Sequence, residues 1–152
     1  MTGGRLARIR DYLNDETFCF TYGDGVSDVD IRKLIDFHHG SGLKATVTAV
    51  QPPGRFGSLD INNKKVQSFN EKPLGDGNWI SGGFFVLDYS IFDLITDDSC
   101  VWEQQPMKNL ASRGELGAFK HHGFWHPMDT LRDKIFLESL WKNNEAPWKV
   151  WL

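Results

Sequence analysis

The sequence predicts an α/β protein, a sandwich in which helices surround a mostly parallel central sheet and a β-hairpin is inserted. Short apolar, β-favouring runs alternate with amphipathic helical patterns, which is typical of βα units. Two short strand patterns flank the polar run 62–65, which indicates a hairpin. With 152 residues, 40% of them hydrophobic and 24% charged, the chain is expected to form one domain over residues 1–152.

The amino-terminal part predicts a helix followed by a strand. Leu6, Ile9 and Leu13 have the i, i+3, i+7 spacing of one helical face. The run 18–22 is rich in aromatic and β-favouring residues and predicts a buried strand. Because Gly23-Asp24-Gly25 ends this strand, one carboxylate is expected at its carboxyl end, where open α/β sheets bind ligands.

The following elements continue the alternation. Ser27 or Asp28 is placed to cap the next helix, which Gly40 and Gly42 end. Pro106 suits the first position of a later helix. The expected elements are, in order, a helix with its apolar face at Ile31, Leu34, Ile35 and His38, a strand at 44–50, a hairpin with strands 58–61 and 66–71, a strand at 79–87, a short helix at 90–95, a helix at 106–113, a strand at 117–124 and an amphipathic helix at 130–143.

Composition narrows the classes of function. A net charge of −3 provides no basic field for nucleic acid, so a phosphate ligand would need a local site. Cys19 and Cys100 are too few for a disulfide framework and are expected to be reduced thiols. No apolar run has the length of a membrane span, and residues 1–10 lack the apolar core of a signal peptide, so we expect a cytoplasmic protein without membrane contact.

Two aspartates are the candidate metal ligands. Asp24 and Asp129 both follow apolar strand patterns, so their carboxylates could meet at one edge of the sheet. Two hard oxygen ligands suit Mg²⁺, which completes its shell with water and substrate phosphates. Each has an ordinary alternative, because Asp-Gly is common turn chemistry and Asp129-Thr130 could equally cap the last helix. The five histidines lack partner cysteines and are not expected to form a Zn²⁺ site.

Six short motifs occur together and in order, and they cover the whole chain. They are Met1-Thr2-Gly3-Gly4-Arg5, Thr21-Tyr22-Gly23-Asp24-Gly25, Pro53-Gly54-Arg55-Phe56-Gly57, Phe69-Asn70-Glu71-Lys72-Pro73, Gly82-Gly83-Phe84-Phe85 and Trp125-His126-Pro127-Met128-Asp129-Thr130. In these motifs the chain resembles the sugar-1-phosphate nucleotidyltransferases, and among them the glucose-1-phosphate cytidylyltransferases. Single motifs such as GDG or EKP are unspecific, whereas six in register are strong evidence.

The resemblance implies a Rossmann-like nucleotidyltransferase fold and transfer of CMP from CTP to glucose 1-phosphate, giving CDP-glucose for deoxysugar synthesis. The family also begins with a glycine-rich loop of the form GGxGTR that cradles the triphosphate, and this sequence contains no such loop. The resemblance therefore implies a carboxyl-terminal portion, a partial domain expected to be inactive alone. The alternative is a non-catalytic fragment that binds sugar phosphate or another subunit, and a homo-oligomer is possible.

The resemblance also assigns roles to individual residues. Asp24 and Asp129 would hold Mg²⁺, and Arg5 would contact the nucleotide together with Thr2 and Gly3, since arginine binds phosphate oxygens in a fork. Glu71 would accept hydrogen bonds from sugar hydroxyls while Lys72 supplies positive charge to the sugar phosphate. Backbone close to the sugar is implied at three glycines, Gly57, Gly82 and Gly83.

Each role has a simpler alternative. Gly3 could belong to a flexible start of an ordinary helix, and the other glycines could serve turns or bulges. Glu71 and Lys72 could form a solvated surface pair.

Overall fold

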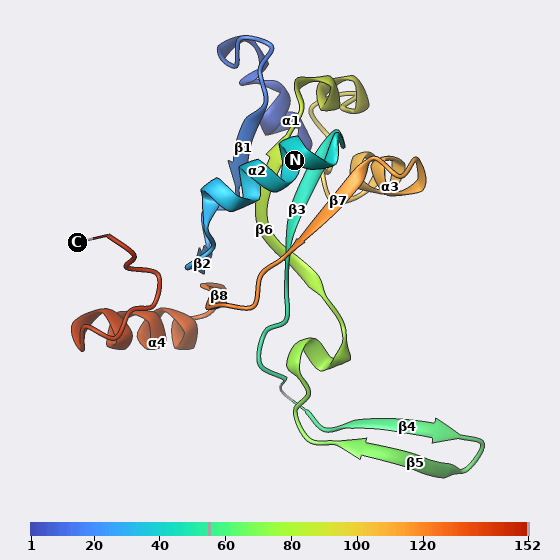
Figure 1. Ribbon diagram of the computed structural model, residues 1–152, viewed down its shortest axis with the longest axis vertical. Helices are drawn as coiled ribbons and strands as arrows, with labels where there is room; N and C mark the ends of the chain where they lie inside the picture. The colour runs from blue at the N-terminus through green and yellow to red at the C-terminus, as the bar shows by residue number, and fades with distance from the viewer. Residues whose placement is uncertain (55, 152) are drawn as a thin grey trace. The chain divides into compact units, whose positions relative to one another are not determined.

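The computed structural model describes residues 1–54 and 56–151 (Figure 1). The chain folds into two compact units. Unit 1 contains Met1–Tyr22, Asp30–Thr48 and Gly83–Phe119, and unit 2 contains Gly23–Val29, Ala49–Gly82 and Lys120–Leu152. The elements are α1 (Thr2–Ala7), β1 (Phe18–Thr21), β2 (Gly25–Ser27), α2 (Ile31–Ser41), β3 (Ala45–Val50), β4 (Ser58–Asn62), β5 (Lys65–Asn70), β6 (Ile80–Leu87), α3 (Gln105–Ser112), β7 (Leu116–Lys120), β8 (Trp125–Pro127) and α4 (Leu131–Lys142), with short 3-10 helices at Arg10–Tyr12, Leu74–Gly77 and Tyr89–Leu94.

A sheet of four strands, in the order β1-β6-β3-β7, forms the centre of the fold. β1 and β6 run antiparallel, with Phe18 opposite Leu87. β3 and β7 run parallel, since the backbone N–H of Ala45 donates to Glu115 and that of His121 donates to Ala49. The expected α/β class is confirmed, and the sheet contains parallel strands, but it is mixed because β6 opposes β1.

Unit 1 has its own hydrophobic core, built on one face of this sheet. Trp102, Leu87 and Ile91 are fully buried, and Phe85 from β6 lies among them. Phe20 of β1 stacks on Phe85, with ring centroids 5.6 Å apart. Burial of several such large side chains, at roughly 1.5–3 kcal/mol each, is the main stabilising contribution in this unit.

Three expectations for the first third of the chain are wrong. The helix expected to bury Leu6, Ile9 and Leu13 on one face ends at Ala7, and Ile9 is exposed. β1 was expected to be buried, but it lies at the edge of the sheet, and its Cys19 is exposed because alternate side chains of an edge strand point away from the core. The helix cap is Asp30, which accepts a hydrogen bond from the N–H of Lys33, rather than Ser27 or Asp28. Gly42 ends this helix in the left-handed region, as expected.

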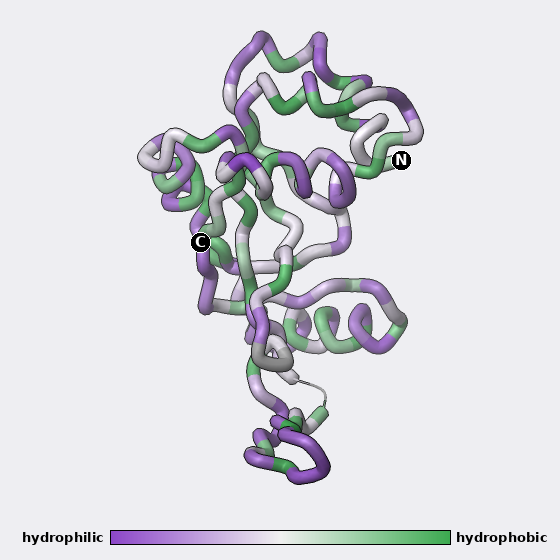
Figure 2. Tube along the Cα trace, turned by 90° about the vertical axis from the view of Figure 1, so that its right-hand side faces the viewer, coloured by the Kyte–Doolittle hydropathy of each residue, from purple (hydrophilic) through white to green (hydrophobic). Residues whose placement is uncertain are grey.

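Unit 2 contains the hairpin, a two-stranded ribbon of β2 and β8, and α4. The hairpin forms as expected, with Leu59 opposite Phe69 and a bulge between Asp60 and Ile61. It carries both hydrophobic and hydrophilic stretches (Figure 2), and its apolar residues stay exposed, Leu59 at 53% and Phe69 at 61%. α4 also forms where expected, whereas the strand expected at 117–124 ends at Lys120 and is followed by the short β8.

The described helices include none that is long and apolar enough to cross a membrane.

Candidate functional site

Asp24 and Asp129 lie at the same end of the ribbon formed by β2 and β8. Gly25 pairs with Pro127 across this antiparallel ribbon, and the N–H of Met128 donates to the carbonyl of Asp24 at 2.8 Å. Asp24 therefore comes directly before β2, and Asp129 comes shortly after the end of β8. The two strands lie side by side in Figure 1. Both aspartates are exposed, so their carboxylates are accessible to a solvated cation and to phosphate.

Side-chain hydrogen bonds hold the ribbon together. The Ser27 hydroxyl donates to the carbonyl of Phe124 at 2.8 Å, and the side chains of His121 and Asp28 meet at 2.8 Å. A Cβ on Gly123 would lie 2.4 Å from an Asp28 oxygen and 2.7 Å from the His121 ring, so a larger residue would have to displace this side-chain pair. The local sequence thus fixes the strands that carry both aspartates.

The structure separates Asp129 from the cap of α4. Thr130 is the cap: its hydroxyl accepts from the N–H of Asp133, and the Asp133 carboxylate accepts from the N–H of Thr130. Among residues 1–54 and 56–151, no hydrogen bond or ion pair involves the Asp129 side chain. Of the two sequence-based interpretations of Asp129-Thr130, capping therefore belongs to Thr130 and leaves the Asp129 carboxylate available.

Asp133 and His126 extend this arrangement. Nε2 of His126, on β8, meets Oδ1 of Asp133 at 3.1 Å, and the Asp133 residue is only 8% exposed. The hydrogen bond from the Thr130 hydroxyl, with help from the Thr130 N–H and His126, holds the pKa of the Asp133 carboxyl below its usual value. Sequence reasoning missed these residues, although Thr130-x-x-Asp133 before an apolar run is the signature of a capping box.

The base of the hairpin brings two of the sequence motifs together. A Cβ on Gly54 would lie 2.3 Å from the carbonyl oxygen of Pro73, and one on Gly57 would lie 2.7 Å from the Phe69 ring and 3.2 Å from an oxygen of Glu71. The segments around Gly54 and Gly57 therefore pack directly on the segment that carries Glu71. Arg55 of the same motif lies outside the described residues.

Lys72 has an unusual backbone conformation. Its φ of 46° lies in the left-handed region, which costs a residue with a side chain roughly 1 kcal/mol or more. Its Nζ lies 3.6 Å from Oε1 of Glu71, and both side chains are more than half exposed. An exposed pair of this kind contributes little to stability, so both groups are accessible to a ligand. Strain of this kind clusters at functional sites.

Gly82 and Gly83 in β6 have separate structural partners. The Trp125 indole donates to the carbonyl of Gly82 at 2.8 Å. Gly83 has a φ of 77°, and a Cβ there would lie 2.6 Å from the Tyr22 ring. Both glycines are buried, so packing within the chain explains them without a ligand.

The predicted nucleotide contacts lie on α1 of unit 1. The Thr2 hydroxyl donates to Glu103 at 2.7 Å and accepts from the N–H of Trp102, and Gly3 is packed on Cys100. Arg5 is exposed, and no ion pair or hydrogen bond of its side chain is found within the described part of the chain. Of the predicted contacts here, Arg5 is the one whose side chain is available.

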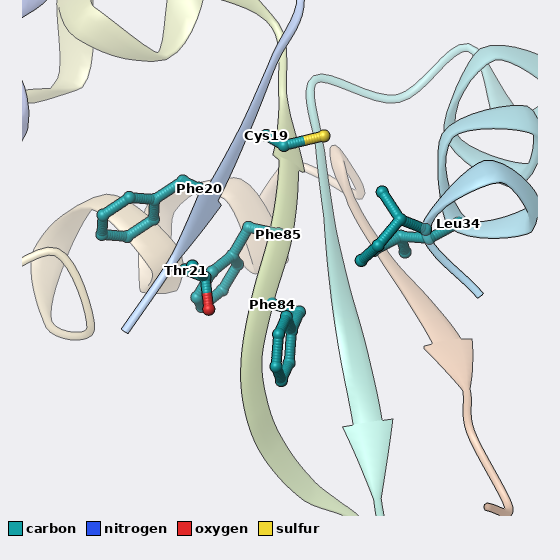
Figure 3. Close-up of a pocket in the computed structure, with 7 residues that line it drawn as sticks. Cys19, Phe20, Thr21, Leu34, Phe84 and Phe85 are labelled. Atoms are coloured by element: carbon teal, nitrogen blue, oxygen red, sulfur yellow. The ribbon is translucent and has the colours of Figure 1, made fainter. Parts of the chain in front are cut away.

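A hollow of about 220 Å³ in unit 1 contains none of the predicted site residues. It lies between β1, β6 and α2, and Figure 3 shows Leu34 facing the sheet across it. Its lining is aromatic and aliphatic apart from Cys19 and Thr21, so it has no group to neutralise a phosphate. This hollow is therefore unsuited to a nucleotide or sugar phosphate.

Over the described ranges, no group of three or more His, Cys, Asp or Glu is arranged to hold a metal ion. The described residues therefore contain no site in which side chains alone would surround a metal ion. Mg²⁺ needs fewer protein ligands, commonly one or two carboxylates, and Asp24 and Asp129 remain the candidates for that role.

The sequence of this chain is similar to those of known proteins. A family model described as nucleotidyl transferase matches residues 2–114. The glucose-1-phosphate cytidylyltransferases of Salmonella typhimurium and Salmonella typhi are each 61% identical over 152 residues, which covers 99% of this chain and 59% of the relative. The chain therefore spans less than two thirds of the length of these relatives.

A solved structure supports the fold. HddC from Yersinia pseudotuberculosis matches with a TM-score of 0.65 at 23% identity, covering 89% of this chain and 60% of that one. Similarity at this identity concerns the fold alone, and together with the family model it confirms the Rossmann-like nucleotidyltransferase fold expected from the sequence. Because the family model covers most of the chain, this protein belongs to the nucleotidyl transferase family.

Proposed function

We propose that this chain supplies the metal-binding and sugar-phosphate-binding residues for CMP transfer from CTP to glucose 1-phosphate, which yields CDP-glucose and pyrophosphate. The observation that carries the proposal is that Asp24 and Asp129 both lie at one end of the β2–β8 ribbon. The names of the 61% identical relatives support the choice of substrates. On the same resemblance, we assign the product to deoxysugar and O-antigen synthesis in the cytoplasm.

Nucleotidyltransferases of this family generally use a divalent metal. Asp24 and Asp129 fit Mg²⁺ because both are hard oxygen donors, both are exposed, and Asp129 is not used as the helix cap. When bound there, Mg²⁺ would neutralise negative charge on the reacting phosphates. The chain's own contribution is to hold two carboxylates just beyond the ends of paired strands, with the N–H of Met128 bonded to the carbonyl of Asp24.

The reaction needs no protein nucleophile. A phosphate oxygen of glucose 1-phosphate forms a bond to the α-phosphorus of CTP, while the bond between the α-phosphorus and the bridging oxygen breaks and pyrophosphate leaves. In this proposal Lys72 binds the sugar phosphate, Glu71 accepts hydrogen bonds from sugar hydroxyls, and the backbone of Gly57 lies beside them. These residues act by holding two anions in line, which is the main requirement of phosphoryl transfer.

We assign the nucleotide contact on α1 to Arg5, since its guanidinium is exposed and can form paired bonds to phosphate oxygens. Thr2 and Gly3 belong to the same proposed contact, but the Thr2 hydroxyl is already bonded to Glu103. Gly82 and Gly83 are proposed sugar contacts through their backbone only. A homo-oligomer is part of the proposal as well.

A second candidate is binding of sugar phosphate without transfer. The hairpin base favours it, because Gly54, Gly57, Glu71 and Lys72 are brought together by the hairpin itself and do not require the aspartate pair. Both candidates predict binding of glucose 1-phosphate, whereas only the first predicts that Mg²⁺ and CTP bind as well.

Calorimetry on the 152-residue chain separates the two. The chain is titrated with glucose 1-phosphate, and with CTP in the presence and absence of Mg²⁺. We expect Asp24→Asn and Asp129→Asn each to weaken Mg²⁺-dependent CTP binding about tenfold or more, because each removes a charged ligand. Asp36→Asn, an exposed aspartate of α2, is the control and is expected to bind like the unmodified chain. Binding of glucose 1-phosphate alone, with no Mg²⁺-dependent CTP binding, would favour the second candidate.

A further inference from the structure

One buried carboxylate holds both sides of the turn that carries Asp129. Oδ1 of Asp133 contacts Nε2 of His126 at 3.1 Å, and Oδ2 of Asp133 accepts from the N–H and the hydroxyl of Thr130 at 2.9 and 2.7 Å. His126 and Thr130 are therefore tied to the same side chain, and Asp129 lies between them in sequence. Because Asp133 is only 8% exposed, water competes poorly for these bonds.

The His126 ring is itself held in place. It packs on Phe136 of α4, with ring centroids 4.8 Å apart, and it stacks against Phe124 at 6.4 Å. A ring between two aromatic neighbours has little rotational freedom. Its contact with Asp133 therefore connects strand β8 to the first turn of α4.

The same turn is connected to the other aspartate. The N–H of Met128 donates to the carbonyl of Asp24 at 2.8 Å. The segment from His126 to Thr130 thus has three attachments: Asp133 at each side and Asp24 near its middle. Asp129 immediately follows the residue bonded to Asp24, so the position of this turn sets the separation of the two carboxylates.

We propose that Asp133 is a positioning residue that fixes the Asp129 carboxylate relative to that of Asp24 for binding of a divalent cation. The inference rests on the proposed function, in which these two aspartates bind the metal. Residues that orient metal ligands from behind are commonly worth ten- to a hundredfold in metal affinity. Asp133 does not contact the cation in this proposal.

The helix cap of α2 provides a comparison within the same chain. Asp30 accepts from the N–H of Lys33 and forms an ion pair with the Lys33 side chain at 3.5 Å, so its contacts are local to one helix. Asp133 also contacts its own helix start but reaches back to His126 on β8. Loss of Asp30 removes a cap alone, whereas loss of Asp133 removes a cap and the attachment of the turn.

The experiment compares Asp133→Ala with Asp30→Ala in the 152-residue chain and uses two readouts. Mn²⁺ affinity is measured by water-proton relaxation, with Mn²⁺ as the probe for a divalent cation. Amide hydrogen exchange of Met128 is measured by NMR without metal and reports the bond to Asp24 directly. Global stability of both variants is measured by denaturant unfolding, so that the Mn²⁺ affinities are compared between folded proteins.

We expect Asp133→Ala to weaken Mn²⁺ binding about ten- to a hundredfold and to speed exchange of the Met128 amide about tenfold or more. Asp30→Ala is expected to leave both within about twofold, because the contacts of the Asp30 side chain are with Lys33 of its own helix. An unchanged Met128 exchange rate in Asp133→Ala, or an Mn²⁺ affinity equal to that of the unmodified chain, would overturn the inference.

Metal binding by the chain and positioning of the turn by Asp133 can be contradicted separately. If the unmodified chain binds no Mn²⁺, the proposed metal function is wrong, and the Met128 exchange rate alone then decides whether Asp133 positions the turn. If Asp133→Ala does not fold, Asp133→Asn keeps the size of the side chain and one acceptor oxygen, and the same two readouts decide. The Asn variant is expected to lie between Asp133→Ala and the unmodified chain in both.

Discussion

At the scale of single residues, the structure assigns neighbouring side chains to different tasks. Thr130 caps α4, and the adjacent Asp129 is left exposed with its carboxylate available. Lys72 is held in a left-handed backbone conformation beside Glu71. His38 is buried against Thr46, whereas its neighbour His39 is exposed. Each contrast gives a pair of substitutions with opposite expected results.

Thr130→Ala and Asp129→Asn separate capping from metal binding. Thr130→Ala should lower the free energy of unfolding by about 0.5–2 kcal/mol, because the first turn of α4 loses its cap. Asp129→Asn should leave that free energy within about 0.5 kcal/mol, as expected for an exposed side chain. Denaturant unfolding of both variants checks this. A large loss of stability in Asp129→Asn, with metal binding intact, would mean that Asp129 is a structural residue.

Substitutions of Lys72 separate the effect of its positive charge from the effect of its left-handed backbone conformation. Lys72→Ala and Lys72→Gly both remove the ammonium and should weaken glucose 1-phosphate binding about ten- to a hundredfold in calorimetry. Lys72→Gly should be more stable than Lys72→Ala by roughly 1 kcal/mol, since glycine adopts a φ of 46° without strain. Lys64→Ala, at the exposed turn of the hairpin, is the control.

The sugar preference tests the partner of Lys72. Glu71→Ala should accept other sugar 1-phosphates more readily, while CTP binding stays nearly unchanged. If neither Glu71 nor Lys72 affects any ligand, the two form an exposed surface pair and the sugar subsite lies elsewhere.

His38 should make the stability of unit 1 depend on pH. Burial, together with His39, holds the pKa of His38 below its usual 6.5, while Asp88 acts in the opposite direction. Because the folded pKa is the lower one, the contribution of the neutral ring is complete above pH 6.5 and is lost as pH falls through the folded pKa.

His38→Asn should reduce this loss of stability at low pH. In the unmodified chain Nδ1 of His38 lies 2.9 Å from the Thr46 hydroxyl, and an amide can keep that hydrogen bond but does not titrate. The measurement is denaturant unfolding at about pH 5.5 and 7.5, a range in which histidine is the main titrating side chain. His39→Asn, on the exposed neighbour, removes only the smaller contribution to the lowered pKa of His38 and should keep most of the pH dependence of the unmodified chain. An equal pH dependence in His38→Asn would show that other groups cause it.

At the scale of elements, Gly54 and Gly40 differ in the space that surrounds them. A Cβ on Gly54 would lie 2.3 Å from Pro73 and 2.7 Å from Lys72, both backbone atoms, so the base of the hairpin would have to move. Gly40 lies within α2, and a Cβ added there would have no neighbouring atom of the described residues within 4 Å. Packing therefore requires glycine at the first position only.

Gly54→Ala should destabilise the chain by roughly 1–3 kcal/mol and weaken glucose 1-phosphate binding, because it displaces the segment of Lys72. Gly40→Ala should stabilise it by about 0.5–1 kcal/mol through helix propensity. Thermal unfolding and calorimetry check both. Full ligand affinity in Gly54→Ala would separate the hairpin base from the sugar subsite.

At the scale of the whole molecule, the edge of the sheet is the feature with the clearest consequence. Within the described residues β1 pairs with β6 alone, so its outer backbone groups are free for another strand. The apolar hollow lined by Phe20, Leu34 and Phe84 lies beside this edge (Figure 3). An open edge next to apolar surface favours association between copies of the chain.

The isolated chain should therefore associate at increasing concentration and bind a dye for exposed apolar surface. Cys19→Lys places a charge on the exposed side of β1 and should reduce the association, whereas Tyr12→Lys, at a residue 81% exposed outside the strand, should not. Size-exclusion chromatography with light scattering measures the effect. A monomer at all concentrations, without dye binding, would contradict this prediction.

Local sequence patterns were sufficient to predict many of the helices and strands. β3, the hairpin, β6 and α4 occur where the sequence predicts them, because each is long enough to show a period of its own. The motifs also led to Asp24 and Asp129 as a pair. By itself, then, the sequence determined the α/β class, the main elements, the family resemblance and the candidate ligands.

Only the tertiary structure decided how those residues meet. β2 and β8 have three residues each and lie about a hundred positions apart, so neither shows a periodicity that would predict their pairing. The attachment of Asp133 to His126 depends on burial between aromatic rings, which no local pattern records. The exposure of Cys19 likewise depends on which strands flank β1. Such features arise from contacts between distant segments, and those contacts form only when the chain has folded.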